Sequence, residues 1–129
     1  MRTIDEIKNE LIEHQRKLDN APIGVGNADA LADYLGVLNN IASRTTFMIA
    51  EATKIRDAAR ASIQDKFSEM LAKMSPSARK DYEKAHTSDE NALHEWVVSM
   101  NETAATQSKN IITMLSYEKQ QIELNRKGY

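Results

Sequence analysis

Histidine and glutamate residues at helical spacing are the side chains of this 129-residue sequence best suited to chemistry. The run His94-Glu95-Trp96-Val97-Val98 begins like the zinc-protease pattern H-E-x-x-H, in which two histidines on one helix face bind zinc and the glutamate acts as the base. Valine occupies the second histidine position, so the motif fails. The sequence has no cysteine, which excludes disulfides and thiolate metal sites.

Two Glu-x-x-x-His pairs remain, Glu10 with His14 and Glu90 with His94. Spacing of four places each pair on one helix face, but carboxylate-bridged di-metal bundles need Glu-x-x-His together with two further inward glutamates. We therefore interpret the pairs as surface ion pairs, and His14 as a polar residue within a helix seam. We expect neither a metal nor a cofactor.

The remaining sequence offers no recognisable catalytic constellation. A dinucleotide-binding loop built on Gly24 and Gly26 would need a third glycine where Asp29 stands, and a strand before it where a helical pattern ends. No serine lies in a recognisable nucleophile context with a histidine or an acid. The prediction is a protein without catalytic residues, not an enzyme.

Composition indicates one folded helical domain, 1–129. The hydrophobic content of 41% is too high for a disordered chain, and the net charge of −2 gives no overall attraction to nucleic acid or anionic membrane. No stretch reaches the roughly 18 apolar residues of a membrane span, and acids stand near the N-terminus where a signal peptide needs apolar residues. We expect a cytoplasmic protein without membrane contact.

Four helical patterns are present, at 4–19, 29–74, 76–86 and 88–126, with apolar residues repeating at spacings of three and four. Thr3 with Glu6 and Thr87 with Glu90 have the spacing of capping boxes. Asn27 or Asp29 can cap the second helix. Ser75 caps the third helix, with Pro76 in its first turn.

The two long patterns predict an all-α fold, a long antiparallel hairpin resembling a coiled coil. At 1.5 Å per residue they would run about 69 Å and roughly 58 Å, and the first helix only about 24 Å. We expect this short helix to cover the N-terminal third of 29–74, which makes a three-helix bundle at one end. Polar residues at 103–108 of the last helix are expected to face Thr45 or the alanine-rich stretch of 29–74.

The other end of the hairpin, with only two long helices and a short third, should leave apolar side chains half exposed. Large exposed apolar patches usually mark interfaces, so we expect a homo-oligomer. The predicted interface residues are Ile55, Ile63, Phe67, Met70, Trp96 and Met100.

Basic residues gather in one part of the chain. Residues 44–84 carry nine basic and six acidic residues, a net charge of +3 within a chain of net charge −2. Mixed charge runs are usually solvated surface, and pairing with Glu51, Asp57, Asp65, Asp81 and Glu83 is the interpretation we favour. The alternative is contact with nucleic-acid phosphates. The candidate contacts are Arg44, Lys54, Arg56, Arg60, Lys66, Arg79, Lys80 and Lys84.

Short runs of the chain also suggest a relationship. ADYLGVL at 32–38, SPS at 75–77, KDYEK at 80–84 and LSYEK at 115–119 resemble small all-helical bacteriophage and prophage proteins, mostly uncharacterised, of recombination and replication modules. The resemblance implies a viral protein in the host cytoplasm and carries over no catalytic residue.

The sequence thus leads to a non-catalytic, oligomeric helical accessory protein of phage origin. It would act through contacts with phage or host proteins, with DNA recombination or replication as the process and nucleic acid as an alternative partner. The other hypothesis is a phage structural or assembly protein, a scaffold or chaperone whose coiled coil is its function.

Overall fold

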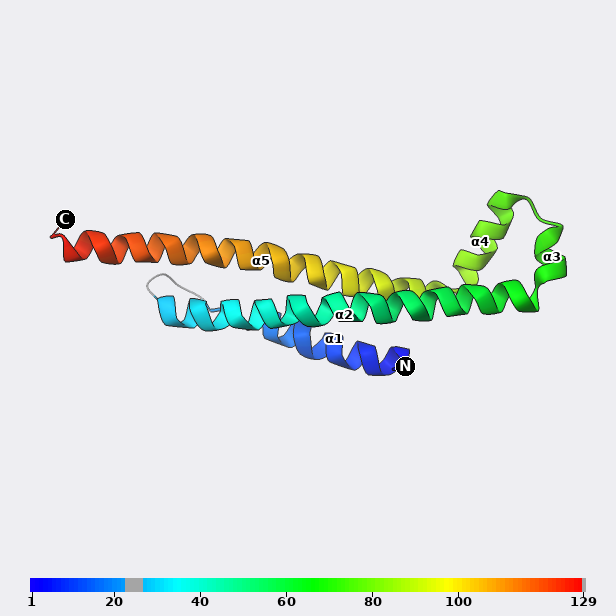
Figure 1. Ribbon diagram of the computed structural model, residues 1–129, viewed down its shortest axis with the longest axis horizontal. Helices are drawn as coiled ribbons and strands as arrows, with labels where there is room; N and C mark the ends of the chain where they lie inside the picture. Colours follow the sequence, from blue (N-terminus) through cyan, green and yellow to red (C-terminus); the bar gives the residue numbers. More distant parts are fainter. Residues whose placement is uncertain (23–26, 129) are drawn as a thin grey trace.

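Two long helices form the body of the protein. The structure, a computed structural model, describes residues 1–22 and 27–128. Helices α2 (Ala28–Lys66) and α5 (Ser88–Arg126) lie antiparallel as a hairpin, and α1 (Ile4–Asp19) packs against both (Figure 1). Short helices α3 (Ser68–Ala72) and α4 (Pro76–His86) join the long ones. The predicted all-α hairpin with a short N-terminal helix is confirmed.

The described residues contain no strand, and none of their helices has the length and apolarity needed to cross a membrane. The glycine-containing connection at 23–26, which we interpret as a turn, lies outside the described residues.

Three of the four predicted helix starts carry an expected cap, and at the start of α2 the Asn27 side chain accepts a hydrogen bond from the amide of Ala30. Thr3 and Glu6 form the capping box, and the Ser75 hydroxyl accepts a hydrogen bond of 3.1 Å from the amide of Ala78. The box predicted at Thr87 is wrong, because the Thr87 side chain does not cap α5. Its hydroxyl instead donates to the Glu83 carbonyl, 2.7 Å away, at the end of the preceding helix.

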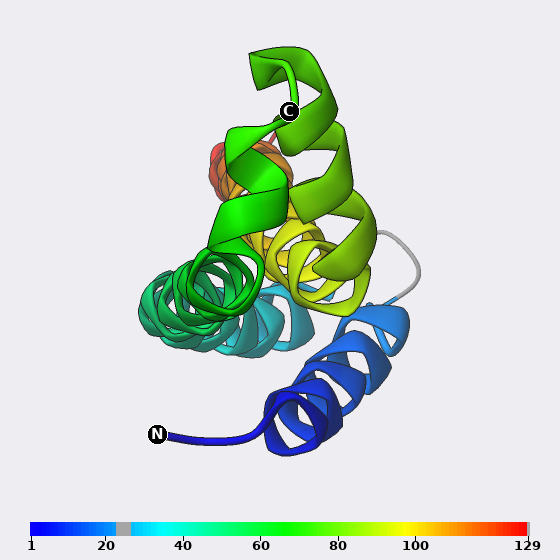
Figure 2. The same ribbon diagram turned by 90° about the vertical axis from the view of Figure 1, so that its right-hand side faces the viewer.

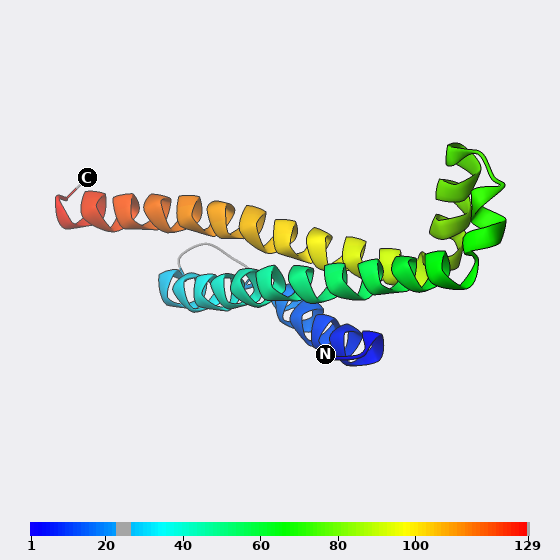
Figure 3. The same ribbon diagram turned by 45° about the vertical axis from the view of Figure 1, so that its right-hand side comes forward.

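The helix predicted at 29–74 is not continuous. It ends at Lys66, Phe67 has non-helical dihedrals (φ −123°, ψ 27°), and α3 continues in a new direction (Figure 3). The apolar repeat continues through this break, so the sequence pattern misses it. Packing accounts for it: the Phe67 ring lies edge-on to Tyr82 of α4, with centroids 5.9 Å apart, and Leu71 of α3 is buried.

The core is a seam between the long helices, extended by one face of α1. Fully buried leucine, isoleucine and methionine side chains each stabilise the fold by about 1.5–3 kcal/mol relative to exposure. Those with no exposed surface are Ile7, Leu11, Leu38, Ile41, Met48 and Leu93.

A polar contact interrupts this seam near its middle. The Asn101 amide of α5 donates to the Thr45 hydroxyl at 2.9 Å and to the Ala42 carbonyl at 3.0 Å. We predicted residues 103–108 at this place, but Thr103 and Thr106 are exposed. A buried polar pair of this kind favours one register of the hairpin, because any shift would leave Thr45 facing apolar side chains.

Helix α1 lies nearer the middle of α2 than predicted. Its ends are placed by Arg2, whose Nε lies 2.9 Å from Glu51, and by the Leu18 carbonyl, which lies 3.0 Å from the Tyr34 hydroxyl. These contacts span α2 from residue 34 to residue 51, beyond its N-terminal third. The last turns of α5 therefore extend past α2 without α1 beside them (Figure 1).

This arrangement changes the predicted oligomer surface. Ile63 and Met100 are buried within the single chain, and Ile55 and Trp96 are half-buried against the core. Only Phe67 and Met70 are exposed, each at 39%. The hairpin corner is covered because α3 and α4 stand side by side over its end (Figure 2). Exposed apolar side chains gather instead toward the C-terminal end of α5: Ile112, Met114, Tyr117, Ile122 and Leu124.

Candidate anion-binding cleft

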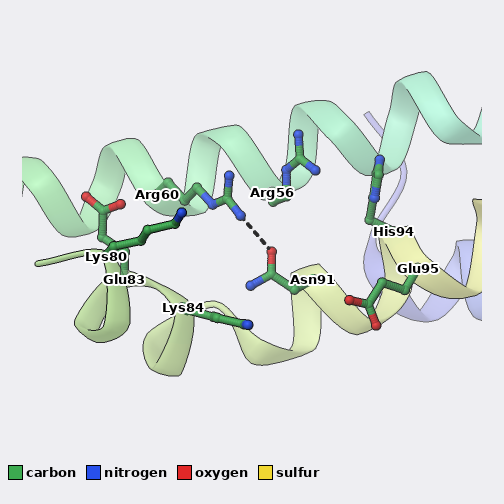
Figure 4. Close-up of a pocket in the computed structure, with 8 residues that line it drawn as sticks. All are labelled: Arg56, Arg60, Lys80, Glu83, Lys84, Asn91, His94 and Glu95. Atoms are coloured by element: carbon green, nitrogen blue, oxygen red, sulfur yellow. Dashed lines mark hydrogen bonds between the residues drawn. The ribbon is translucent and has the colours of Figure 1, made fainter. Parts of the chain in front are cut away.

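A cleft of about 400 Å³ opens where α4 meets the two long helices (Figure 4). Its wall is made by α2, α4 and α5, and most of its lining is charged. The lining residues are Arg56, Arg60, Lys80, Glu83, Lys84, Asn91, His94 and Glu95.

Local sequence explains why these side chains meet. Arg56 and Arg60 are four residues apart on α2, and Lys80 and Lys84 are four apart on α4, so each pair shares one helix face. Ser75 and Pro76 start α4 directly after a short turn, which brings its basic face back toward α2. Figure 4 shows Lys80 extending from α4 toward Arg60.

Arg60 is held in place by a series of hydrogen bonds through uncharged groups. Its Nη2 donates to the Asn91 side-chain oxygen at 3.1 Å. The Asn91 amide donates to the Thr87 hydroxyl at 3.0 Å, and that hydroxyl donates to the Glu83 carbonyl. Thr87 is fully buried. This series fixes the guanidinium without neutralising its charge.

The cations of the cleft are poorly compensated. Among the described residues, Arg56 pairs only with its neighbour Asp57, at 3.3 Å. Arg60, Lys80 and Lys84 form no ion pair within 4.0 Å with any other residue among 1–22 and 27–128. Glu83 faces the cleft, but its carboxylate accepts a hydrogen bond of 2.9 Å from the Gln64 amide. Like charges gathered in a concave site attract an anion.

Four of the eight predicted nucleic-acid contacts therefore come together, namely Arg56, Arg60, Lys80 and Lys84. Lys54, Lys66 and Arg79 do not line this cleft. The predicted pairing of the basic run with helix-surface acids occurs at Asp57. Among Asp65, Asp81 and Glu83, none forms an ion pair with a described residue.

Sequence reasoning missed the third wall of the cleft. Asn91, His94 and Glu95 come from the first turns of α5, and nothing in their local pattern indicates a role beside α4. One signal was present, because Thr87 and Asn91 are four residues apart and can hydrogen-bond on a helix face. His94 lies in the cleft wall, and the predicted ion pair between His94 and Glu90 does not form.

Arg44 belongs to a different and fully paired cluster. It donates to Glu10 at 2.9 and 2.7 Å, and Arg2 donates to Glu10 at 2.7 Å. Its guanidinium also lies over the Phe47 ring, 5.1 Å from the centroid. Glu51 takes the remaining contacts of Arg2. Two arginines and two glutamates thus neutralise one another across α1 and α2.

These contacts shift the ionisation of the cluster. The Arg44 hydrogen bond, followed by those from His14 and Arg2, lowers the pKa of Glu10 to about 2 despite its partial burial. The Arg2 hydrogen bond likewise lowers the pKa of Glu51. The pKa of Arg2 is raised, chiefly by its hydrogen bond to Glu51.

His14 occupies the buried edge of this cluster. It is 4% exposed, and its Nε2 lies 2.8 Å from Glu10, so the predicted Glu10–His14 pair forms but is largely buried. Its Nδ1 is buried without a hydrogen-bond partner among the described residues. No group of three or more His, Cys, Asp or Glu side chains within 1–22 and 27–128 is arranged to hold a metal ion.

Comparison of the chain with protein-family models, with curated proteins and with solved structures found no match. The basic cleft, in which Arg60, Lys80 and Lys84 have no ion-pair partner among the described residues, is the main structural indication of a function.

Proposed function

We propose that this protein is a non-catalytic helical accessory protein that binds a nucleic-acid backbone through the cleft between α2, α4 and α5. The observation that supports the proposal most is the presence of Arg60, Lys80 and Lys84 in one concave site without ion-pair partners among the described residues. Phage origin and a role in recombination or replication stay predictions from the sequence resemblance.

Phosphate groups fit this site better than other anions of similar size. A guanidinium presents a planar fork of N–H donors that matches a phosphate, and nearby lysines add positive charge without directional demands. The cleft lining contains no Phe, Tyr or Trp, so the His94 imidazole is the only lining ring on which a base could stack. Binding should therefore be indifferent to base sequence, since contacts to the backbone carry no sequence information directly.

The proposal predicts binding that weakens steeply with salt, because each neutralised phosphate releases counterions. Replacing Arg56 and Arg60 with glutamate should reduce affinity for DNA by about tenfold or more at low salt and flatten the salt dependence. Fluorescence anisotropy with a labelled oligonucleotide at several salt concentrations measures both effects.

A matched control changes the same net charge elsewhere. Lys109→Glu with Lys119→Glu reverses two exposed lysines of α5 that do not line the cleft. It should weaken binding only slightly. Arg2 is unsuitable as a control because it is part of the α1–α2 ion-pair cluster. Equal loss in the two double variants, or no binding by the unaltered protein at low salt, would rule out the cleft as the site.

A second candidate function is self-association, which the exposed apolar side chains of α5 favour. Ile112, Ile122 and Leu124 are 52%, 54% and 43% exposed in the C-terminal half of α5. Several exposed apolar side chains in one region commonly mark an interface. Light scattering should then give a mass well above 14.5 kDa at micromolar concentration. Ile122→Glu should lower that mass, whereas Phe67→Glu at the other end of the hairpin should not. A monomeric mass for the unaltered protein would exclude this candidate.

A further inference from the structure

We infer that the cleft selects single-stranded over double-stranded nucleic acid, with Arg60 as its anchor, held in a binding orientation by Asn91 and Thr87. The inference rests on the proposed function and specifies both its ligand class and the residues that position the anchor.

The shape of the site supports a single strand. Helix α4 stands across the end of the hairpin, so the cationic groups lie at an inside corner with walls on three helices (Figures 1 and 4). A volume of about 400 Å³ lies at the small end of the range of ligand pockets, roughly 300–1,000 Å³. A single strand is flexible enough to place one or two phosphates in such a corner. Duplex DNA is stiff over about 150 base pairs and cannot bend sharply into it without a large deformation energy.

The charge pattern agrees with the shape. Glu83 and Glu95 also line the cleft. A duplex would bring the phosphates of two strands to this corner, so some of them would meet these carboxylates. One strand can follow the cations and avoid both acids. Because the lining contains carboxylates as well as cations, its affinity should be lower for a duplex, which has the higher phosphate density, than for a single strand.

Arg60 is the cation best prepared to bind. Lysine and arginine side chains lose rotamer freedom when they grip a ligand, and this loss weakens binding. The hydrogen bond from Nη2 to Asn91 removes part of that freedom in advance and uses only one of the guanidinium N–H groups. The remaining N–H groups are available for a phosphate. Asn91 is itself oriented by the buried Thr87 hydroxyl, so it acts as a positioning residue for Arg60.

The experiment compares a labelled mixed-sequence single strand of about twenty nucleotides with its blunt duplex, by anisotropy at one low salt concentration. The expected result is a preference of about tenfold or more for the single strand, a fold-change typical of one good phosphate anchor and its charge neighbours. Equal or tighter duplex binding would overturn the inference but leave the proposed function intact, provided that Arg56→Glu with Arg60→Glu still weakens duplex binding by about tenfold or more.

The positioning role is tested by a double-mutant cycle. Asn91→Ala should weaken single-strand binding about fivefold in the unaltered protein and have little further effect in an Arg60→Ala background, because it acts only through Arg60. Asn110→Ala, at an exposed asparagine of the same helix, is the matched control and should leave affinity unchanged. A loss of the same size in both backgrounds would mean that Asn91 acts through folding, and would contradict the positioning role.

Competition by inorganic pyrophosphate distinguishes a site for a nucleic-acid strand from a site for a small phosphate anion. It should compete only weakly, when compared at the same concentration of phosphate groups as the oligonucleotide. Competition as strong as that of the unlabelled strand would make the cleft a small-phosphate site and would overturn the assignment of a nucleic-acid strand.

Discussion

Two charged regions of this molecule differ in how their arginines are used. On the α1 side, Arg2 and Arg44 lie within hydrogen-bond distance of Glu10 and Glu51, and the four charges cancel. At the hairpin corner, Arg60 is held by the neutral Asn91, with Lys80 and Lys84 beside it and no carboxylate in an ion pair with them among the described residues.

The difference assigns the two regions to different tasks. A cluster whose partners are inside the chain contributes to folding, because its charge-assisted hydrogen bonds form only when α1 docks on α2. A cluster of cations without ion-pair partners contributes little to folding stability or slightly lowers it, but it can bind an anion. Arg44, which the sequence placed among the nucleic-acid contacts, belongs to the first group and lies outside the cleft.

The largest expected effect on stability comes from Glu10. Glu10→Gln removes the carboxylate shared by Arg2, Arg44 and His14, and leaves Arg44 without its ion-pair partner while Arg2 keeps Glu51. We expect the free energy of unfolding to fall by about 2 kcal/mol, measured by urea denaturation. Glu13→Gln is the control on the same helix: its pair with Arg16 is exposed, and exposed pairs contribute roughly 0–1 kcal/mol. Equal losses in both variants would contradict the folding role of the cluster.

Acid should remove much of the same contribution. The pKa of Glu10 is lowered from the ordinary glutamate value of 4.5 to about 2 in the folded protein. A depressed folded pKa stabilises the fold above the unfolded pKa, and this stabilisation is lost as pH falls from about 4.5 toward 2. The difference in unfolding free energy between the unaltered protein and Glu10→Gln should therefore be full at pH 7 and shrink below pH 4.5. A difference that stays constant down to pH 2.5 would mean that the Glu10 charge is not responsible.

The smallest effect is expected at the corner. Lys80→Gln or Lys84→Gln removes one of several like charges, so the free energy of unfolding should stay unchanged or rise by up to about 0.5 kcal/mol, more at low salt than at high salt. Lys54→Gln, at an exposed lysine outside the cleft, should produce no salt-dependent change. A clear loss of stability in the Lys80 variant would show that this lysine supports the fold, and would remove the contrast between the two regions.

Local sequence was sufficient for most of the helix boundaries, but not for the break at Phe67. Apolar residues repeating every three or four positions depend only on the geometry of one helix, and so do the caps at Thr3 and Ser75, where a side chain bonds a backbone amide three residues away. The hairpin followed from the lengths of the two longest patterns. The position of α1 did not follow, because it depends on contacts such as Arg2 with Glu51 and Tyr34 with Leu18, which link residues far apart in the chain.

For the candidate site too, part of the information is local to the sequence and part depends on the tertiary structure. The sequence identified Arg56, Arg60, Lys80 and Lys84 among eight candidate phosphate contacts, and their spacing of four places each pair on one helix face. Only the tertiary structure brought these faces together, because the long helix ends before Phe67 and α4 folds back over the hairpin. Whether a cation is neutralised also depends on this arrangement: Arg44 meets Glu10 from another helix, and Arg60 meets the uncharged Asn91. Charge pairing is decided by distance in space, and distance in sequence does not determine it.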